Sequence, residues 1–164
     1  MDSLRDRHAL VIGGSRGIGR SVAAALVAAG AKVTIVGRDQ CALGDTVAAG
    51  DAHGFAAADV TDAGAVRRAA DIAAKDRGPI DLLIANAGAA ESAPFAKSDD
   101  QLFRRMLDVN LMGAVHAAQA VLGKMVERGF GRVVNITSGA VKAPIDILGL
   151  SNGARSGLTG FVAG

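Results

Sequence analysis

The stretch Ala-Leu-Val-Ile-Gly-Gly-Ser-Arg-Gly-Ile-Gly, residues 9–19, decides the fold of this chain. It begins as a short apolar run typical of a buried strand, breaks at a glycine pair, and opens into an Ala-rich helical segment over residues 20–29. Free N–H groups and the positive end of a helix dipole bind phosphate at such a turn. The spacing G-x-x-x-G-x-G differs from the common G-x-G-x-x-G, and a plain turn is the alternative. We predict nucleotide binding here.

The turn residues have separate expected tasks. Gly13 allows the tight exit from the strand, Gly17 lets a phosphate approach the backbone, and Gly19 lets the helix pack against the strand. The candidate nucleotide-binding residues of this turn are Gly13, Ser15, Arg16, Gly17, Ile18 and Gly19.

Composition limits the class of protein. A chain of 164 residues is long enough for one domain. Hydrophobic residues make up 50% of the chain and aromatic residues only 3%, a composition that favours helices packed on a buried parallel sheet. The net charge of +2 gives no reason to expect nucleic acid as a partner, and no run is long enough for a membrane span. The single Cys41, expected in a surface helix, has no partner for a disulfide or a metal. We predict a soluble, cytoplasmic protein without a metal site.

Strands and helices alternate along the rest of the chain. Further apolar strands are predicted over residues 33–36, 55–58, 80–85 and 131–137, and helices over 40–49, 62–76, 98–128 and from 151. Asp39, Thr61 and Ser98 are the expected N-caps. This order predicts an α/β fold, a parallel sheet with helices on both faces, in a single domain over residues 1–164.

Five separate segments are expected to meet at one crevice. Gly13, Arg38, Asp59, Asn86 and Ser138 each follow a predicted strand. The carboxyl ends of parallel strands lie at the same edge of a sheet, where open α/β sheets bind ligands. This convergence is stronger support for a binding site than any one motif.

The chain resembles the short-chain dehydrogenase/reductase family over essentially its whole length. The matching pieces are the glycine turn, Asp59-Val60, Asn86-Ala87-Gly88, Asn110 and Ser138, in the family's order and spacing. The resemblance implies a Rossmann-type doubly wound parallel sheet with helices on both faces. It also implies a nicotinamide dinucleotide cofactor and hydride transfer between it and a small alcohol or carbonyl substrate.

The resemblance also implies roles on the cofactor side. Asp59 would bond the adenine amino group with help from the Val60 backbone. The alternative is that Asp59 caps the following helix, and both roles could hold. Asn86, Ala87 and Gly88 would run beside the adenosine ribose, with Asn86 tying neighbouring strands together; a pure turn is the alternative.

On the substrate side, the resemblance implies that Asn110 sits at a helix irregularity and holds a water for proton relay, unless it points to solvent. Ser138 would bond the substrate oxygen, unless it is a simple loop-start hydroxyl.

The end of the second strand bears on cofactor choice. NAD is usually read there by an acidic side chain on the ribose 2′-hydroxyl, but this strand is followed by Arg38. Arg38 could form bidentate hydrogen bonds with a 2′-phosphate. Asp39 is expected to cap a helix, although it could instead turn inward and bind the ribose 2′-hydroxyl. NADP(H) is therefore favoured, with NAD(H) possible.

The chain departs from the family at its catalytic pair. The spacing from Ser138 puts the family's Tyr and Lys at positions 151 and 155, where this chain has Ser151 and Arg155, and it contains no Tyr at all. A phenol with a pKa of about 10 is a far better acid than an aliphatic hydroxyl. Ser151 would relay a proton through water, and Arg155 could hold ribose hydroxyls or an anionic substrate. We predict an oxidoreductase with altered acid/base chemistry; the alternative is a weak or inactive NADP(H)-binding protein, a sensor or an oligomer partner.

Two further expectations follow from the resemblance. Family members continue through two more strands, so the sequence is expected to be the N-terminal part of a longer chain. They also pair through long helices, here residues 102–125 and from 151, which predicts a homodimer or homotetramer.

Overall fold

A five-stranded parallel sheet forms the centre of the protein in the computed structural model, which describes residues 4–89 and 97–164. The strand order is β3-β2-β1-β4-β5. The strands are β1 (His8–Ile12), β2 (Lys32–Gly37), β3 (Gly54–Ala57), β4 (Leu82–Ala85) and β5 (Arg132–Asn135). The chain moves outward from β1 in one direction and then returns to β4 on its other side. This reversal makes the β1/β4 boundary the switch point of the predicted doubly wound sheet.

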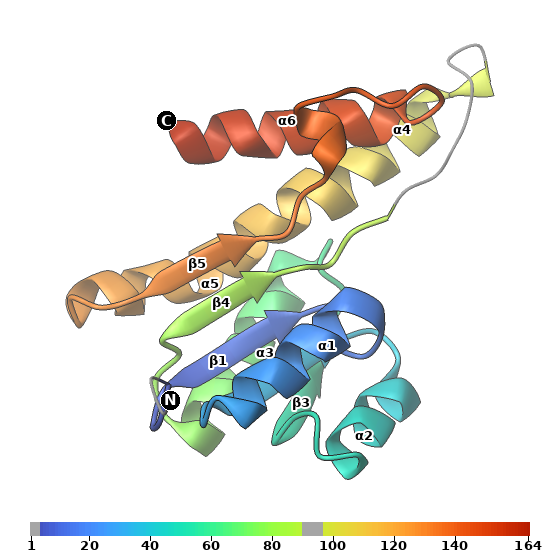
Figure 1. Cartoon of the computed structure of the whole chain (residues 1–164). Coiled ribbons are helices and arrows are strands. Elements are labelled where there is room, and N and C mark those ends of the chain that lie inside the picture. Colours follow the sequence, from blue (N-terminus) through green and yellow to red (C-terminus); the bar gives the residue numbers. More distant parts are fainter. Residues whose placement is uncertain (1–3, 90–96) are drawn as a thin grey trace.

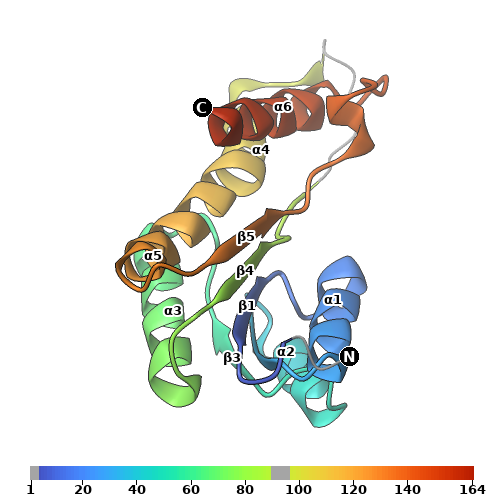
Figure 2. The ribbon, with the colours of Figure 1, turned by 60° about the vertical axis from the view of Figure 1, so that its left-hand side comes forward.

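Helices cover both faces of the sheet, as predicted. Figure 2 shows α1 (Gly17–Ala28) and α2 (Gln40–Ala48) on one face, and α3 (Ala63–Arg77) and α5 (Gly113–Glu127) on the other. Alternate residues of β1 serve the two layers: Ala9 and Val11 pack toward α1 and α2, whereas Leu10 and Ile12 join the core beneath α3 and α5. Small Ala side chains let these helices approach the strands closely, which explains how the protein forms two cores with few aromatic residues.

The long helix predicted over residues 98–128 is interrupted. It consists of α4 (Asp100–Leu107), a π-helical turn η2 (Asp108–Met112), and α5. The turn places Asn110 in the buried wall between α4 and α5. The irregularity implied for Asn110 is therefore present, and such turns often occur at functional sites.

Two predicted N-caps are wrong by one residue. Asp62, not Thr61, caps α3 by accepting from the Ala65 N–H, and Asp99, not Ser98, caps α4 by accepting from the Leu102 N–H. A carboxylate at the neighbouring position reaches the free N–H groups and is also favoured by the helix dipole. The expected cap of α2 is confirmed, since Asp39 accepts from the Ala42 N–H at 3.1 Å.

The ends of several elements also differ from prediction. α1 begins at Gly17 rather than residue 20 because the last turn glycines already form its first turn. β4 and β5 are shorter than predicted, and α6 (Gly149–Ala163) begins two residues earlier. Residues 89–97, between the strand predicted over 80–85 and the helix predicted over 98–128, are expected to form a loop, and most of them lie outside the described residues. Within the described part of the chain, no helix is long and apolar enough to cross a membrane.

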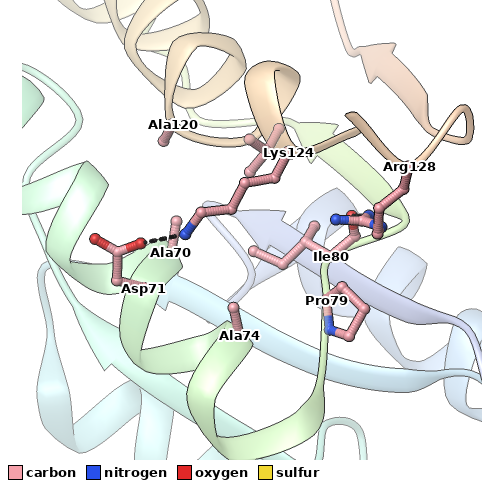
Figure 3. Close-up of a pocket in the computed structure, with 9 residues that line it drawn as sticks. Ala70, Asp71, Ala74, Pro79, Ile80, Ala120, Lys124 and Arg128 are labelled. Atoms are coloured by element: carbon pink, nitrogen blue, oxygen red, sulfur yellow. Dashed lines mark hydrogen bonds and ion pairs between the residues drawn. The ribbon is translucent and has the colours of Figure 1, made fainter. Parts of the chain in front are cut away.

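A small recess lies at the amino-terminal edge of the sheet, opposite the predicted crevice. Figure 3 shows it between α3 and α5, bordered by Pro79, Ile80 and the ion pair in which Lys124 Nζ lies 2.8 Å from Asp71 Oδ1. Its volume of about 20 Å³ accommodates roughly one water molecule. The recess is a packing feature between two helices.

His8 is fully buried at this same edge. Its Nδ1 donates to the Gly78 carbonyl at 2.7 Å, because a carbonyl can only accept, and its Nε2 lies 2.9 Å from Thr34 Oγ1. Burial lowers the pKa of His8, with nearby Arg77 acting in the same direction against the raising effects of the Gly78 carbonyl and Asp81. The neutral imidazole is therefore the form that the fold stabilises.

This burial predicts acid sensitivity of the fold. Below the unfolded-state pKa of about 6.5, the unfolded chain binds a proton that the folded chain resists, so the free energy of unfolding should fall as the pH is lowered from 7.5 to 5.5. Urea unfolding followed by far-ultraviolet circular dichroism measures it. His8→Gln, which cannot titrate, should show a flatter pH dependence whatever its absolute stability. Equal slopes for the two proteins would contradict this prediction.

Candidate functional site

The glycine turn between β1 and α1 forms an open cradle. Gly13 has φ +76° and Gly17 has φ +54°, a region that residues with a side chain rarely adopt. A Cβ at Gly17 would meet no described atom within 4 Å, so the backbone there is open to an incoming group. The 12-residue helix α1 begins at this point and directs its unpaired N–H groups toward the same space.

The turn is fixed from beneath by Asn86, directly after β4. Asn86 Nδ2 donates to the Gly13 carbonyl at 3.1 Å and thereby ties the ends of β1 and β4 together, as the resemblance implied. A Cβ at Gly13 would lie 3.0 Å from the Ala87 backbone, and a Cβ at Gly19 would collide with the Gly13 carbonyl and the Asn86 amide. Both glycines are therefore required by close packing at the switch point. Ser15 is held too, because its carbonyl accepts from Thr46 Oγ1 at 3.2 Å.

The end of β2 presents a cation. Arg38 is largely exposed, and its Nη1 lies 3.8 Å from Asp59 Oδ2 beyond the neighbouring strand β3. The Asp39 carboxylate is engaged with the first turn of α2. Arg16 and Ile18 are exposed at the head of α1. This corner of the crevice therefore presents the two arginines Arg16 and Arg38 beside the glycine turn, together with the carboxylates of Asp39 and Asp59.

Asp59 shapes the loop after β3 rather than capping a helix, so the helix-cap alternative is wrong. Its Oδ1 accepts from the Thr61 N–H at 2.9 Å and from the Thr61 hydroxyl at 2.8 Å. The Thr61 N–H bond lowers the pKa of Asp59 most, and the Thr61 hydroxyl and Arg38 lower it further, whereas partial burial opposes them. Asp59 is a charged acceptor at this edge.

His116 is a supporting residue that sequence reasoning missed. From α5, its Nδ1 donates to the Val60 carbonyl at 2.9 Å. A Cβ at Gly113, one helical turn earlier, would lie 2.9 Å from Val60 Cγ2. α5 therefore fixes the backbone of the Asp59-Val60 loop. No local pattern in the sequence points to this contact, since 56 residues separate the partners.

Asn110 joins the π-turn to the segment after β4. Its Oδ1 accepts from the Ala89 N–H at 3.0 Å, and its Nδ2 donates to the Ala89 carbonyl at 2.9 Å and to the Met106 carbonyl at 3.0 Å. With an exposure of 3%, Asn110 does not point to solvent, so that alternative is wrong. It fixes the strand exit just beyond Gly88.

Ser151 and Arg155 face each other on α6. Ser151 is buried, and its Oγ accepts from Arg155 Nε at 3.3 Å. Arg155 Nη1 donates to the Ile136 carbonyl at 3.2 Å, and a Cβ at Gly88 would lie 2.6 Å from Nη2. Burial lowers the pKa of Arg155. The guanidinium thus lies against the exit of β4, beside the segment that Asn110 fixes.

Ser138 lies after β5, at the head of a short 3₁₀ turn, η3 (Gly139–Val141). Its Oγ accepts from the Ala140 N–H at 3.1 Å, so the hydroxyl has at least the turn-forming role that was the alternative reading. Its O–H can still donate to a bound oxygen. The structure thus brings all five strand-end residues to one edge of the sheet. In Figure 1, α4 and α6 lie above β5.

The parallel sheet, its switch point and the glycine cradle define a Rossmann-type α/β protein. Residues 7–164 match the family model described as short chain dehydrogenase, and the chain belongs to this family.

Relatives agree with this assignment. The chain is 35% identical over 156 residues to the 2-dehydro-3-deoxy-L-rhamnonate dehydrogenase (NAD(+)) of Sphingomonas sp. (strain SKA58), covering 94% of this chain and 63% of that one. Levodione reductase superposes with a TM-score of 0.91 at 30% identity, covering 96% of this chain and 64% of that one. A variant of actinorhodin polyketide ketoreductase with NADPH superposes with a TM-score of 0.88 at 28% identity, covering 98% of this chain and 63% of that one. The chain thus spans less than two thirds of the length of each.

Proposed function

We propose that this chain is the dinucleotide-binding part of an NADP(H)-dependent oxidoreductase acting on a small carbonyl or alcohol substrate. The observation that carries the proposal is the open cradle at Gly17, set between the start of α1 and the cation Arg38. Family membership supports it, and the relatives named above are dehydrogenases and reductases.

The residues present fit a dinucleotide. The open backbone at Gly17 and the N–H groups of α1 suit a pyrophosphate. Asp59 and Val60 would hold the adenine, and Asn86, Ala87 and Gly88 would line the ribose. When bound, the nicotinamide supplies or accepts the hydride exchanged with the carbonyl carbon.

Arg38 supports NADP(H) over NAD(H). A carboxylate that binds the ribose 2′-hydroxyl would be Asp39 here, but its Oδ1 accepts from the Ala42 N–H. Arg38, by contrast, has an exposed side chain beside the cradle and only a long ion pair to Asp59. A guanidinium forms bidentate bonds with phosphate, which favours the phosphorylated ribose.

The proposed acid/base side is atypical. Ser151 and Arg155 would stand where the family has Tyr and Lys, with Ser138 donating to the substrate oxygen and Arg155 stabilising negative charge near it. Asn110 would hold a water that relays protons to Ser151. The buried Ser151–Arg155 contact supports this placement because it puts a hydroxyl and a cation together. The competing proposal is a binder without turnover.

Cofactor fluorescence and absorbance test both proposals. The chain contains no Trp or Tyr, so NADPH emission can be followed with little protein background. We expect saturable NADPH binding and a slow, substrate-dependent loss of NADPH absorbance with reactive diketones or quinones. Binding without turnover would favour the inactive alternative, whereas absence of NADPH binding would overturn the proposal.

We further propose that residues 1–164 form one domain and that it assembles as a homodimer or homotetramer through α4, α5 and α6. Phe103 on α4 and Leu122 on α5 are 48% and 43% exposed, as expected of residues that a second copy would cover. Light scattering at micromolar concentration should give a dimer or tetramer that Leu122→Glu weakens. The matched control is Ile72→Glu on α3, where a 51% exposed residue should tolerate the charge without a change of mass. A monomeric wild type would contradict the proposal.

A further inference from the structure

His116 connects α5 to the loop between β3 and α3. The helices α3 and α5 lie side by side on one face of the sheet (Figure 2). His116 Nδ1 lies 2.9 Å from the Val60 carbonyl, and because a carbonyl only accepts, this nitrogen carries a proton and donates. Gly113, on the same face of α5, lets the helix come close, since a Cβ there would lie 2.9 Å from Val60 Cγ2. The helix backbone and the imidazole therefore both contact Val60.

The peptide group that His116 holds is the centre of a tight turn. The Asp62 N–H donates to the Asp59 carbonyl at 3.1 Å, which closes the turn. Its central peptide joins Val60 to Thr61. The carbonyl of this peptide accepts from His116, and its N–H donates to Asp59 Oδ1 at 2.9 Å. A central peptide can rotate while the ends of a turn stay in place, as types I and II show. His116 and Asp59 together fix its orientation.

The orientation of this peptide directs the Asp59 carboxylate. Asp59 Oδ1 accepts from both the N–H and the hydroxyl of Thr61, so Oδ2 is the oxygen that faces Arg38 Nη1, 3.8 Å away. The Thr61 N–H is also the largest cause of the lowered pKa of Asp59. Rotation of the peptide would withdraw this N–H and release the carboxylate. The direction of Asp59 therefore depends on a peptide group that His116 holds from the other side.

We propose that His116 is a positioning residue for the cofactor, acting through the Val60–Thr61 peptide to direct the Asp59 carboxylate toward the adenine amino group. This proposal rests on the proposed function, in which Asp59 accepts from that amino group. Without the Nδ1 donor, the carbonyl of Val60, a residue only 8% exposed, would lose a hydrogen bond that it makes inside the protein. Such a loss is costly for a buried acceptor, so the peptide would turn toward another donor.

The preference for adenine over hypoxanthine measures this role. Reduced nicotinamide hypoxanthine dinucleotide phosphate has a 6-oxo acceptor where NADPH has an amino donor. Fluorescence titration of the full chain gives both dissociation constants. Wild type should favour NADPH by at least about tenfold, as for a hydrogen bond to a charged group. His116→Leu, which fills the space without a donor, should reduce the preference to less than about threefold. A variant that only lost stability would keep the ratio of the two constants.

His116→Asn is the matched variant, because Asn Nδ2 stands where His Nδ1 stands relative to Cβ and because Asn has nearly the shape of Leu. It should keep the preference within about twofold of wild type, since the donor is retained. Gln119→Leu, at an exposed position of α5, is the control and should leave the preference unchanged. Asp59→Ala should abolish the preference, and adding His116→Leu to it should change nothing further, because the two residues act on one contact.

The outcomes separate this proposal from the proposed function. An unchanged preference in His116→Leu, or equal losses in His116→Leu and His116→Asn, would overturn the positioning role. A further change when His116→Leu is added to Asp59→Ala would show that His116 acts by another route. If wild type binds both dinucleotides equally well, the adenine contact of Asp59 and this proposal fail while NADPH binding stands. If wild type binds neither, the proposed function fails and this proposal fails with it.

Discussion

The double variant Ser151→Tyr/Arg155→Lys is expected to raise the NADPH-dependent reduction of diketones or quinones by about 10²–10⁴-fold, the usual contribution of a well-placed general acid. A phenol beside a cation has its pKa lowered toward working pH, whereas the hydroxyl of Ser151 is a much weaker acid. Stopped-flow or steady-state loss of NADPH absorbance measures the change.

Geometry explains why both changes are needed. Arg155 Nε lies 3.3 Å from Ser151 Oγ, so a ring at position 151 needs space next to the guanidinium, which a slimmer Lys side chain releases. Ser151→Tyr alone and Arg155→Lys alone should each give much less.

Ser151→Phe/Arg155→Lys is the matched control, because it adds the same ring without the acidic hydroxyl and should not gain activity. The argument fails if wild type already turns over rapidly and the double variant slows it, since Ser151 and Arg155 would then form a working site of another design.

Arg38→Ala is expected to weaken NADPH binding by roughly 1.5–3 kcal/mol, the worth of hydrogen bonds to a charged group, or about 10- to 150-fold. NADH should be nearly unaffected because it lacks the 2′-phosphate. The exposed position of Arg38 and its 3.8 Å separation from Asp59 leave it available to a ligand.

Isothermal titration with both cofactors measures the difference. Arg67→Ala, on the exposed surface of α3, removes one positive charge elsewhere and controls for the general field of the protein. Equal losses for NADPH and NADH in Arg38→Ala would show that Arg38 does not bind the 2′-phosphate.

Local sequence patterns were sufficient to predict the order of strands and helices along the chain. Apolar runs predicted the five strands, and the alternation with helices predicted parallel pairing and two covered faces. The glycine turn could also be predicted from the sequence. Gly13 and Gly17 have positive φ, a backbone conformation that glycine adopts readily and that other residues rarely adopt. The edge of the sheet that carries Arg38, Asp59, Asn86 and Ser138 followed directly from that topology.

Side-chain partners were decided by tertiary structure. Asp59 and Asp62 both stand near the start of α3, and only the path of the chain decided that Asp62 caps the helix while Asp59 holds Thr61. Likewise, the position of Asn110 in the wall of the crevice depends on three backbone contacts, two of them made 21 residues away. The partners of His116 and Arg155 are also distant in sequence. Hydrophobic periodicity and glycine conformations are local properties that a sequence displays, whereas a charge or an amide finds its partner only after packing has fixed which backbone groups remain within its reach.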